Sequence, residues 1–438
     1  MLLGAALQRN FGFYDPLGVV LVFLALAAGV AGIAGARVPR RLGVDRALKL
    51  GLLAELLFML IGRQGMEIVL TPGLDLRPYA IGMAAISVAV LAQMAGRLGS
   101  ERWGFPVVLV AVAGLGWWTI QSSPSPHFDV FVFQQNASSA LLHGTNPYQM
   151  RFPDIYGPGS PFYGPGLSDG HQTLFGFPYP PLSLLFAVAG YLVAGDYRYA
   201  VLAAMLLTAI LIAVSSRGAR ARAAAQLLLL VPTNLFLIEV GWNEPFAAML
   251  VALLMLLEIR RPRLTPLALG LLMAVKQYLV GVPAVAYYFL APKAGRGNAL
   301  RGVMVAVVIS LIVTLPLAVL APQDFVSSVI WLQFRQPFRA DSLNLAGLIH
   351  ALTGWELPAM VGFVALLVAL VAAIRVAPRK AAGFGAVLAV AYLAFFAFGR
   401  WAFGNYYWFV TACFCAVICA ASSDGILELD DGSARHTT

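Results

Sequence analysis

The sequence predicts an all-α protein that crosses a membrane many times. Of its 438 residues, 60% are hydrophobic and only 11% are charged, whereas soluble globular proteins carry roughly 25% charged residues. Apolar runs recur along the chain, each near the roughly 20 residues that span the hydrocarbon core of a bilayer. Examples are 18–36, 299–321, 357–374 and 381–398. No large soluble domain is left over.

The basic residues are distributed as membrane topology requires. The basic residues that give the chain its net charge of +9 do not line one polar face but are spread through short loops. Nucleic acid is therefore not an expected partner. Positive-inside logic places these loops in the cytoplasm. Six segments hold 19 of the 29 basic residues: 37–49, 97–102, 217–222, 260–263, 293–301 and 375–380.

With these loops inside and the N-terminus outside, the chain is predicted to form about thirteen transmembrane helices. The first run has a single early arginine and no small-residue cleavage site before a polar chain, so we expect a retained span. The expected spans are 18–36, 47–62, 79–95, 105–120, 199–216, 223–240, 243–259, 264–276, 278–291, 299–321, 357–375, 381–398 and 403–421.

The apolar run 180–195 is the exception. If it crossed the membrane, the basic segment 217–222 would be forced outside. We therefore expect a juxtamembrane helix on the outer leaflet, opened by Pro180 and Pro181, since proline suits a first helical turn. The predicted organisation is N-terminal transmembrane helices (1–120), an extracytoplasmic catalytic loop carrying this helix (121–198), a transmembrane core (199–421) and a cytoplasmic tail (422–438).

The segment 121–198 differs in composition from the rest of the chain. Between 121 and 179 it holds three Asp, three His and a dense set of Pro, Gly and Tyr, which predicts many turns. A loop longer than about 15 residues is usually functional or disordered, and this one is too aromatic for simple disorder. We expect it to pack on the membrane surface as a lid or binding site.

Residues 264–293 lie between two cytoplasmic basic loops and are too short for an ordinary pair of spans. The sequence predicts a hairpin of two short helices with Lys276 and Gln277 at its apex. A cation at that depth is costly unless a partner meets it. It either contacts an anion such as a lipid phosphate or snorkels to the outer surface.

Asp129 follows the span 105–120, where the chain leaves the membrane on the outer side. A carboxylate there is a candidate general base, because partial desolvation raises its pKa toward the working range. The alternative is a helix-capping or solvated interfacial carboxylate. Periodicity does not separate the two.

Several short motifs follow one another along the chain: Asp129, Leu142, Gly144, Asn146-Pro147-Tyr148, Tyr179-Pro180-Pro181-Leu182, Gly195-Asp196, Arg198-Tyr199, Trp242-Asn243-Glu244-Pro245, Lys276-Gln277-Tyr278, Arg339, Asp341-Ser342-Leu343 and Asn405-Tyr406-Tyr407. Their order and spacing resemble the GT-C superfamily of membrane glycosyltransferases, and within it glycosyltransferase family 87, the polyprenyl-phosphate-mannose-dependent mannosyltransferases. The resemblance covers roughly 129–410, although three extra apolar runs precede the large outer loop.

The resemblance implies roles for individual residues. Asp129 corresponds to the aspartate that activates the acceptor, and Lys276 to a basic residue at the apex of the short hairpin. Donor-phosphate binding is expected from Lys276, Arg335, Arg339 and Arg400, with some of these arginines pairing instead with Asp324 or Asp341. Acceptor or sugar binding is expected from His127, Asn146, Tyr148, Tyr179 and Glu244.

Glu244 and His127 each have a second interpretation. Glu244 starts a predicted span, where a helix dipole favours a carboxylate and Pro245 suits the first turn. A single loop histidine such as His127 is more often solvated. No spacing of His or carboxylates indicates a metal site, and phosphate-cradling glycine motifs are absent. We expect no cofactor and leave a divalent-metal requirement undecided.

The resemblance thus implies an inverting glycosyltransferase of the bacterial plasma membrane with its active site on the extracytoplasmic side. Its expected partners are a polyprenyl-phosphate sugar donor, a glycolipid or cell-envelope polysaccharide acceptor, and the bilayer. Mannose is the first expectation and arabinofuranose, from decaprenyl-phosphate arabinose, the second. A lipid-linked-sugar transporter or flippase is the alternative from another class, although we find no internal repeat typical of transporters.

Overall fold

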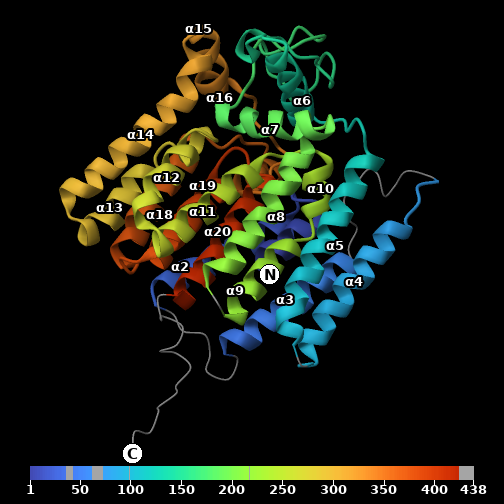
Figure 1. Ribbon diagram of the computed structural model, residues 1–438. Helices are drawn as coiled ribbons and strands as arrows, with labels where there is room; N and C mark the ends of the chain where they lie inside the picture. The colour runs from blue at the N-terminus through green and yellow to red at the C-terminus, as the bar shows by residue number, and fades with distance from the viewer. Residues whose placement is uncertain (36–42, 62–72, 98, 217, 424–438) are drawn as a thin grey trace, which may run out of the picture.

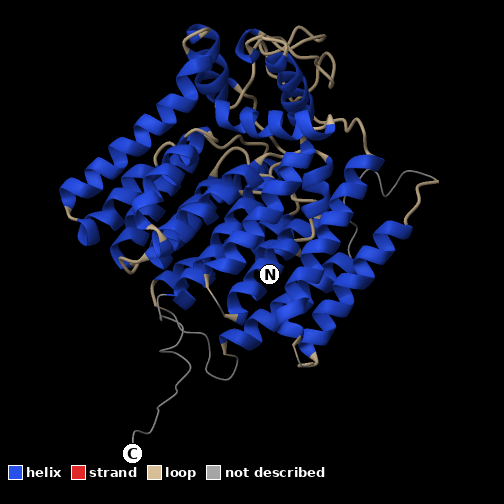
Figure 2. Ribbon diagram, in the orientation of Figure 1, coloured by secondary structure: helices blue, strands red, loops and turns tan. Residues whose placement is uncertain are grey.

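The computed structural model describes residues 1–35, 43–61, 73–97, 99–216 and 218–423, and within these ranges the chain is helical, with isolated β-bridges only (Figure 2). Most of the predicted tail 422–438 lies outside the described residues. The long helices are α2 (Pro16–Ile33), α3 (Val44–Ile61), α4 (Arg77–Met94), α5 (Ser100–Ser122), α8 (Arg198–Ser215), α11 (Glu244–Arg260), α14 (Arg296–Ala318), α18 (Met360–Val376), α19 (Ala381–Phe398) and α20 (Gly404–Ser423).

Shorter elements fill the connections and one end of the molecule. They are α1 (Leu2–Arg9), α6 (Asp129–Leu142), η2 (Pro147–Gln149), α7 (Pro181–Ala194), α9 (Ala219–Leu229), α10 (Asn234–Glu239), η3 (Pro262–Leu264), α12 (Thr265–Met273), η4 (Gln277–Leu279), α13 (Val282–Ala294), α15 (Pro322–Phe325), the π-helical turn η5 (Val326–Trp331), α16 (Leu332–Arg335) and α17 (Leu345–Thr353). In Figure 1 the long helices run roughly side by side, and α6, α7, α15 and α16 gather at their upper end.

The chain is a helical membrane protein. Seven described helices are long and apolar enough to cross a bilayer, judged by length and composition: α2, α4, α5, α8, α14, α19 and α20. The remaining predicted spans coincide with α3, which carries several charges, and with helices of 17 residues or fewer. The total of thirteen therefore stays a prediction.

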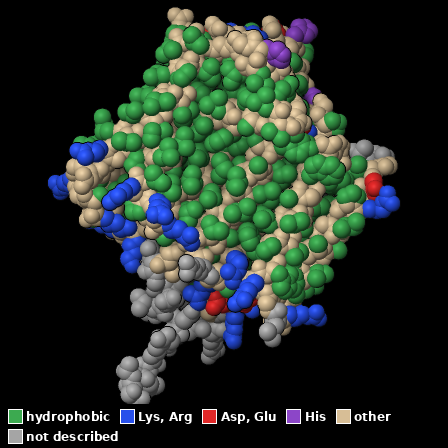
Figure 3. Space-filling model, viewed as in Figure 1, with side chains coloured by type: hydrophobic (Ala, Val, Ile, Leu, Met, Phe, Trp, Pro, Cys, Tyr) green, Lys and Arg blue, Asp and Glu red, His purple; other side chains and the backbone are tan. Residues whose placement is uncertain are grey.

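The two ends of the bundle differ in the side chains they carry. On the face drawn in Figure 3, most Lys and Arg side chains lie along the lower and left edges, whereas the histidines lie at the upper end near α6. This is the distribution that positive-inside topology requires. The assignment of the upper end to the extracytoplasmic side remains a prediction.

The run 180–195 forms α7, which begins at Pro181 and ends at Ala194. Gly195 follows it with a φ of +74°, the left-handed conformation common just after helices. Figure 1 shows α7 lying across the ends of the long helices and not along them. The predicted hairpin also forms: α12 and α13 are two short helices, and Lys276 stands between them in extended conformation.

One predicted span is not a single continuous helix in the structure. Residues 223–240 form two helices, α9 and α10, separated by a break at Pro232. A proline removes a backbone donor and ends the preceding helix. Two carbonyls freed at the end of α9 accept hydrogen bonds from Asn234 Nδ2, which lies 3.0 Å from the Leu228 oxygen and 2.8 Å from the Leu229 oxygen.

Arg198, the first residue of α8, ties three helices together from a fully buried position. Its guanidinium lies 2.6 Å from the Asp196 carboxylate and donates to the carbonyls of Glu239 in α10 and Ile120 in α5. These bonds fix the helix ends on which the outer segment rests.

We expect Arg198→Met to lower the free energy of unfolding by about 3 kcal/mol or more, because it leaves a partly buried carboxylate and two carbonyls without their partner. Arg77 offers a matched control, since it pairs with Asp75 two residues earlier at the surface, where an ion pair contributes little. Thermal unfolding of the purified variants in detergent measures both. Equal losses for Arg198→Met and Arg77→Met would contradict the assignment.

Candidate active site

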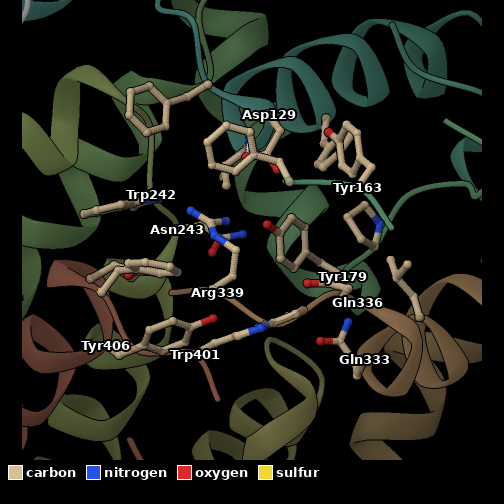
Figure 4. A pocket seen from close by; sticks show the side chains of 18 of the residues that line it. Asp129, Tyr163, Tyr179, Trp242, Asn243, Gln333, Gln336, Arg339, Trp401 and Tyr406 are labelled. Atoms are coloured by element: carbon tan, nitrogen blue, oxygen red, sulfur yellow. Dashed lines mark hydrogen bonds between the residues drawn. The ribbon is translucent and has the colours of Figure 1, made fainter. Parts of the chain in front are cut away.

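A small polar cavity lies at the upper end of the bundle, where α6, the outer segment, α11, the hairpin apex and α20 meet. Its volume is about 140 Å³, below the roughly 300–1,000 Å³ of sites for drug-sized ligands. Figure 4 shows the side chains that point into it, among them Asp129 and Arg339. Of the residues predicted for the site, five line this cavity: Asp129, Tyr179, Glu244, Lys276 and Arg339.

Asp129 is the first residue of α6, directly after Phe128, whose extended backbone starts the helix. One carboxylate oxygen accepts a hydrogen bond from the Val130 N–H at 2.7 Å, and the Asp129 N–H donates to the Tyr156 hydroxyl at 3.3 Å. Burial raises the pKa of this carboxyl, while Arg339 opposes the rise. Asp129 is thus both a helix-start carboxylate and a cavity-lining group, so the two sequence-based interpretations are compatible.

Arg339 is held rigidly at the edge of the cavity. Its Nε and Nη2 donate to the two carboxylate oxygens of Asp341 at 2.8 and 2.7 Å. The guanidinium lies between the rings of Phe162 and Phe403, 4.5 and 4.7 Å from their centres. Cation–π contact and bidentate pairing both restrict a guanidinium, so Arg339 provides a fixed positive charge near Asp129.

Lys276 and Glu244 form a buried ion pair in the floor of the cavity. Lys276 Nζ lies 2.7 Å from Glu244 Oε1, and the side chains are only 5% and 1% exposed. Asn405 Nδ2 donates to the other carboxylate oxygen at 2.7 Å, and the ammonium lies 4.6 Å from the centre of the Tyr179 ring. The partner that a lysine at this depth needs is therefore Glu244.

A larger apolar cavity of about 680 Å³ adjoins the polar one. Walls shared by both come from Tyr179, Lys276, Gln333, Gln336, Trp401 and Tyr406. The larger cavity continues between α14, the η5–α16 segment, α18 and α19. Arg400 lines this cavity. Its Nη2 lies 3.6 Å from Glu356 Oε2, and its buried Nε has no hydrogen-bond partner.

Four residues predicted for donor or sugar binding line neither cavity. Arg335 donates to the Gly166 carbonyl at 3.3 Å, and the exposed His127 ring packs edge-on against Tyr156. Asn146 caps η2 by accepting from the Tyr148 N–H and donates to the Leu317 carbonyl. Tyr148 is fully buried and donates to the Tyr179 carbonyl. The hydrogen bonds of Arg335, Asn146 and Tyr148 position the outer segment, and His127 packs on that segment, so these four are not part of the site.

Sequence reasoning missed other cavity residues. Tyr156 and Tyr163 come from the aromatic outer segment, where nothing local distinguishes one ring from another. Asn243 was part of a motif but was given no role of its own. Its position between Trp242 and Glu244, directly before a helix, is the signal that could have identified it.

Together the fold and the site define a class: a helical membrane protein with a carboxylate-containing polar cavity that opens onto an apolar one. No family model matches the chain, and no curated protein matches it. Two crystal structures of ArnT from Cupriavidus metallidurans are similar, one bound to undecaprenyl phosphate and one in the apo state. Sequence identities are 19% and 18%, and both TM-scores are 0.45. The matches cover 75% and 74% of this chain but only 63% and 62% of ArnT.

Proposed function

We propose that this protein is a membrane glycosyltransferase that transfers one sugar from a polyprenyl-phosphate donor to a glycolipid or cell-envelope glycan. The observation that carries the proposal is the joining of the two cavities at Lys276. A polyprenyl-phosphate sugar has an apolar chain, an anionic phosphate and a polar ring in that order. The apolar cavity, the lysine and the polar cavity follow the same order.

In this proposal the donor enters laterally from the outer leaflet, and its chain occupies the apolar cavity. Lys276 binds the phosphate, with Arg400 as the second cation because its Nε is without a partner. Guanidinium and ammonium groups are the usual phosphate-binding side chains. Glu244 is already bonded to Lys276 and Asn405, so it acts as a counter-ion that holds the lysine in place.

The transfer step needs one base. Asp129 takes the proton of the acceptor hydroxyl, whose oxygen forms a bond to the anomeric carbon of the donor sugar. The bond from that carbon to the phosphate oxygen breaks, and its electron pair leaves with the polyprenyl phosphate. One base and a good leaving group suit direct displacement with inversion, whereas a covalent intermediate requires a second, nucleophilic carboxylate. Mannose is the first candidate sugar and arabinofuranose the second.

The proposal is tested by reconstituting the purified protein in proteoliposomes with radiolabelled polyprenyl-phosphate mannose or decaprenyl-phosphate arabinose and an envelope lipid extract. We expect a new labelled glycolipid from one of the donors, and envelope glycolipids short by that sugar in cells lacking the protein. A flippase would move the donor across the bilayer without forming a glycosidic product. Absence of product from both donors would contradict the proposal.

The pH dependence gives a further expected result. Asp129 acts only when deprotonated, so transfer falls as the pH drops through its pKa, which burial raises and Arg339 lowers. Arg339→Gln removes the opposing charge, raises that pKa further and shifts the acidic limb of the kcat/KM profile to higher pH. Arg151→Gln, which removes an exposed arginine near Asp324, serves as control. An unshifted acidic limb in Arg339→Gln would count against Asp129 as the base.

A further inference from the structure

Besides Glu244 Oε1, which is ion-paired with Lys276, three polar atoms of residues that line the polar cavity are buried without a hydrogen-bond partner. They are the amide nitrogen of Asn243, the amide oxygen of Asn405 and the hydroxyl of Tyr163. A buried polar group without a partner is costly, and such groups are usually completed by water or a ligand. The three residues come from segments far apart in the sequence and line the same cavity, so their proximity to one another is a property of the fold.

Asn243 is the most informative of the three. It is the residue directly before α11, the capping position at which the side chain of an asparagine normally accepts a hydrogen bond from its own helix, yet its side chain makes no such bond. Asn344, directly before α17, does so: its side-chain oxygen accepts from the Gly347 N–H at 2.9 Å. Asn243 therefore forgoes a stabilising contact, and Figure 4 shows it among the side chains lining the cavity.

The neighbours of Asn243 indicate what it would meet. The next residue, Glu244, pairs with Lys276, and Asn405 donates to the same carboxylate. A group esterified to a phosphate at Lys276 and directed away from the apolar cavity therefore enters the polar cavity, which Asn243 and Asn405 line. Because a hydroxyl both donates and accepts, a ring bearing several hydroxyls matches an amide nitrogen, an amide oxygen and a phenol.

We propose that Asn243, with Asn405 and Tyr163, binds hydroxyls of the donor's neutral sugar, and that Asn243 determines the preference for a sugar-bearing lipid over bare polyprenyl phosphate. This inference rests on the proposed function. It assigns recognition of the sugar to the start of α11, separately from the phosphate contact at Lys276 and the base at Asp129.

The test compares the binding of three lipids to the full-length protein in nanodiscs: polyprenyl phosphate, polyprenyl-phosphate mannose and decaprenyl-phosphate arabinose. In the wild type, one sugar-bearing lipid should bind more tightly than the bare one. Asn243→Ala should weaken that lipid roughly tenfold and leave bare polyprenyl phosphate unchanged. Asn344→Ala should instead lower the melting temperature and leave the ratio of the two affinities as in the wild type.

Asn243→Leu provides a second variant of similar shape in case the alanine variant does not fold. It replaces the amide donor with a methyl group and should cause the same selective loss. Equal weakening of both lipids, no weakening, or a wild type that does not distinguish sugar-bearing from bare lipid would each overturn the inference. A wild type that binds none of the three lipids would overturn the proposed function itself.

Discussion

Asp129→Asn should reduce the rate of sugar transfer roughly 100- to 10,000-fold, the range that a positioned general base contributes. The amide keeps the shape of the carboxylate at the start of α6 and can still accept from the Val130 N–H, so folding should survive. It has no basicity with which to take a proton from the acceptor. Initial rates of labelled transfer in proteoliposomes, with donor and acceptor at saturation, measure the effect.

Asp169→Asn is the matched control for this substitution. Asp169 lies in the same outer segment, is exposed, and accepts from the N–H groups of His171 and Gln172, but it does not line the cavity. Its replacement should leave the rate close to that of the wild type. Asp129→Asn should itself still bind the donor as tightly as the wild type does. A wild-type rate in Asp129→Asn would exclude the carboxylate as the base.

The positions of the helices were largely predictable because the physical signal is strong and local. An apolar run bounded by basic loops has few alternatives in a bilayer, and the same charge pattern predicted that 180–195 would be set apart from the spans. The structure forms a separate helix there, α7. The start of α7 could also be predicted from the local sequence, because Pro180 and Pro181 determine it.

What the sequence did not predict depends on contacts between distant segments. The eight-residue helix α1 is too short for a hydropathy signal, and its buried residues are explained only by what they pack against. The break between α9 and α10 shows the same limit: Pro232 marks it, but the hydrogen bonds that Asn234 donates to the freed carbonyls are not visible in a hydropathy pattern.

The candidate site shows a similar division. Asp129, Lys276 and Glu244 stood out because a charged residue at a membrane boundary requires an explanation. Asn146 and Tyr148 were equally prominent in the motifs, yet their side chains hold the outer segment in place. A motif marks residues that line the site as well as residues that only hold it in place. Only the three-dimensional contacts separate a side chain that faces the cavity from one that supports it.

The ion pair between Lys276 and Glu244 gives the second large expected effect. Lys276→Met leaves Glu244 as a buried carboxylate without its cation, and breaking such a pair costs about 3–5 kcal/mol. The double variant Lys276→Met with Glu244→Gln removes both charges and should recover most of that stability, since a buried pair is often replaceable by neutral groups. Thermal unfolding of the wild type, both single variants and the double variant gives the four unfolding free energies of a double-mutant cycle.

Binding of polyprenyl phosphate to the same four proteins separates stability from function. The double variant should be folded but bind the phosphate weakly, because it lacks the ammonium that we propose as the donor contact. The exposed pair of Lys49 and Glu101, 3.8 Å apart, provides a control in which the same two substitutions should change stability little. If the stable double variant bound polyprenyl phosphate as tightly as the wild type, Lys276 would be a purely structural partner of Glu244. The phosphate would then have to be bound by Arg400 and its neighbours in the apolar cavity.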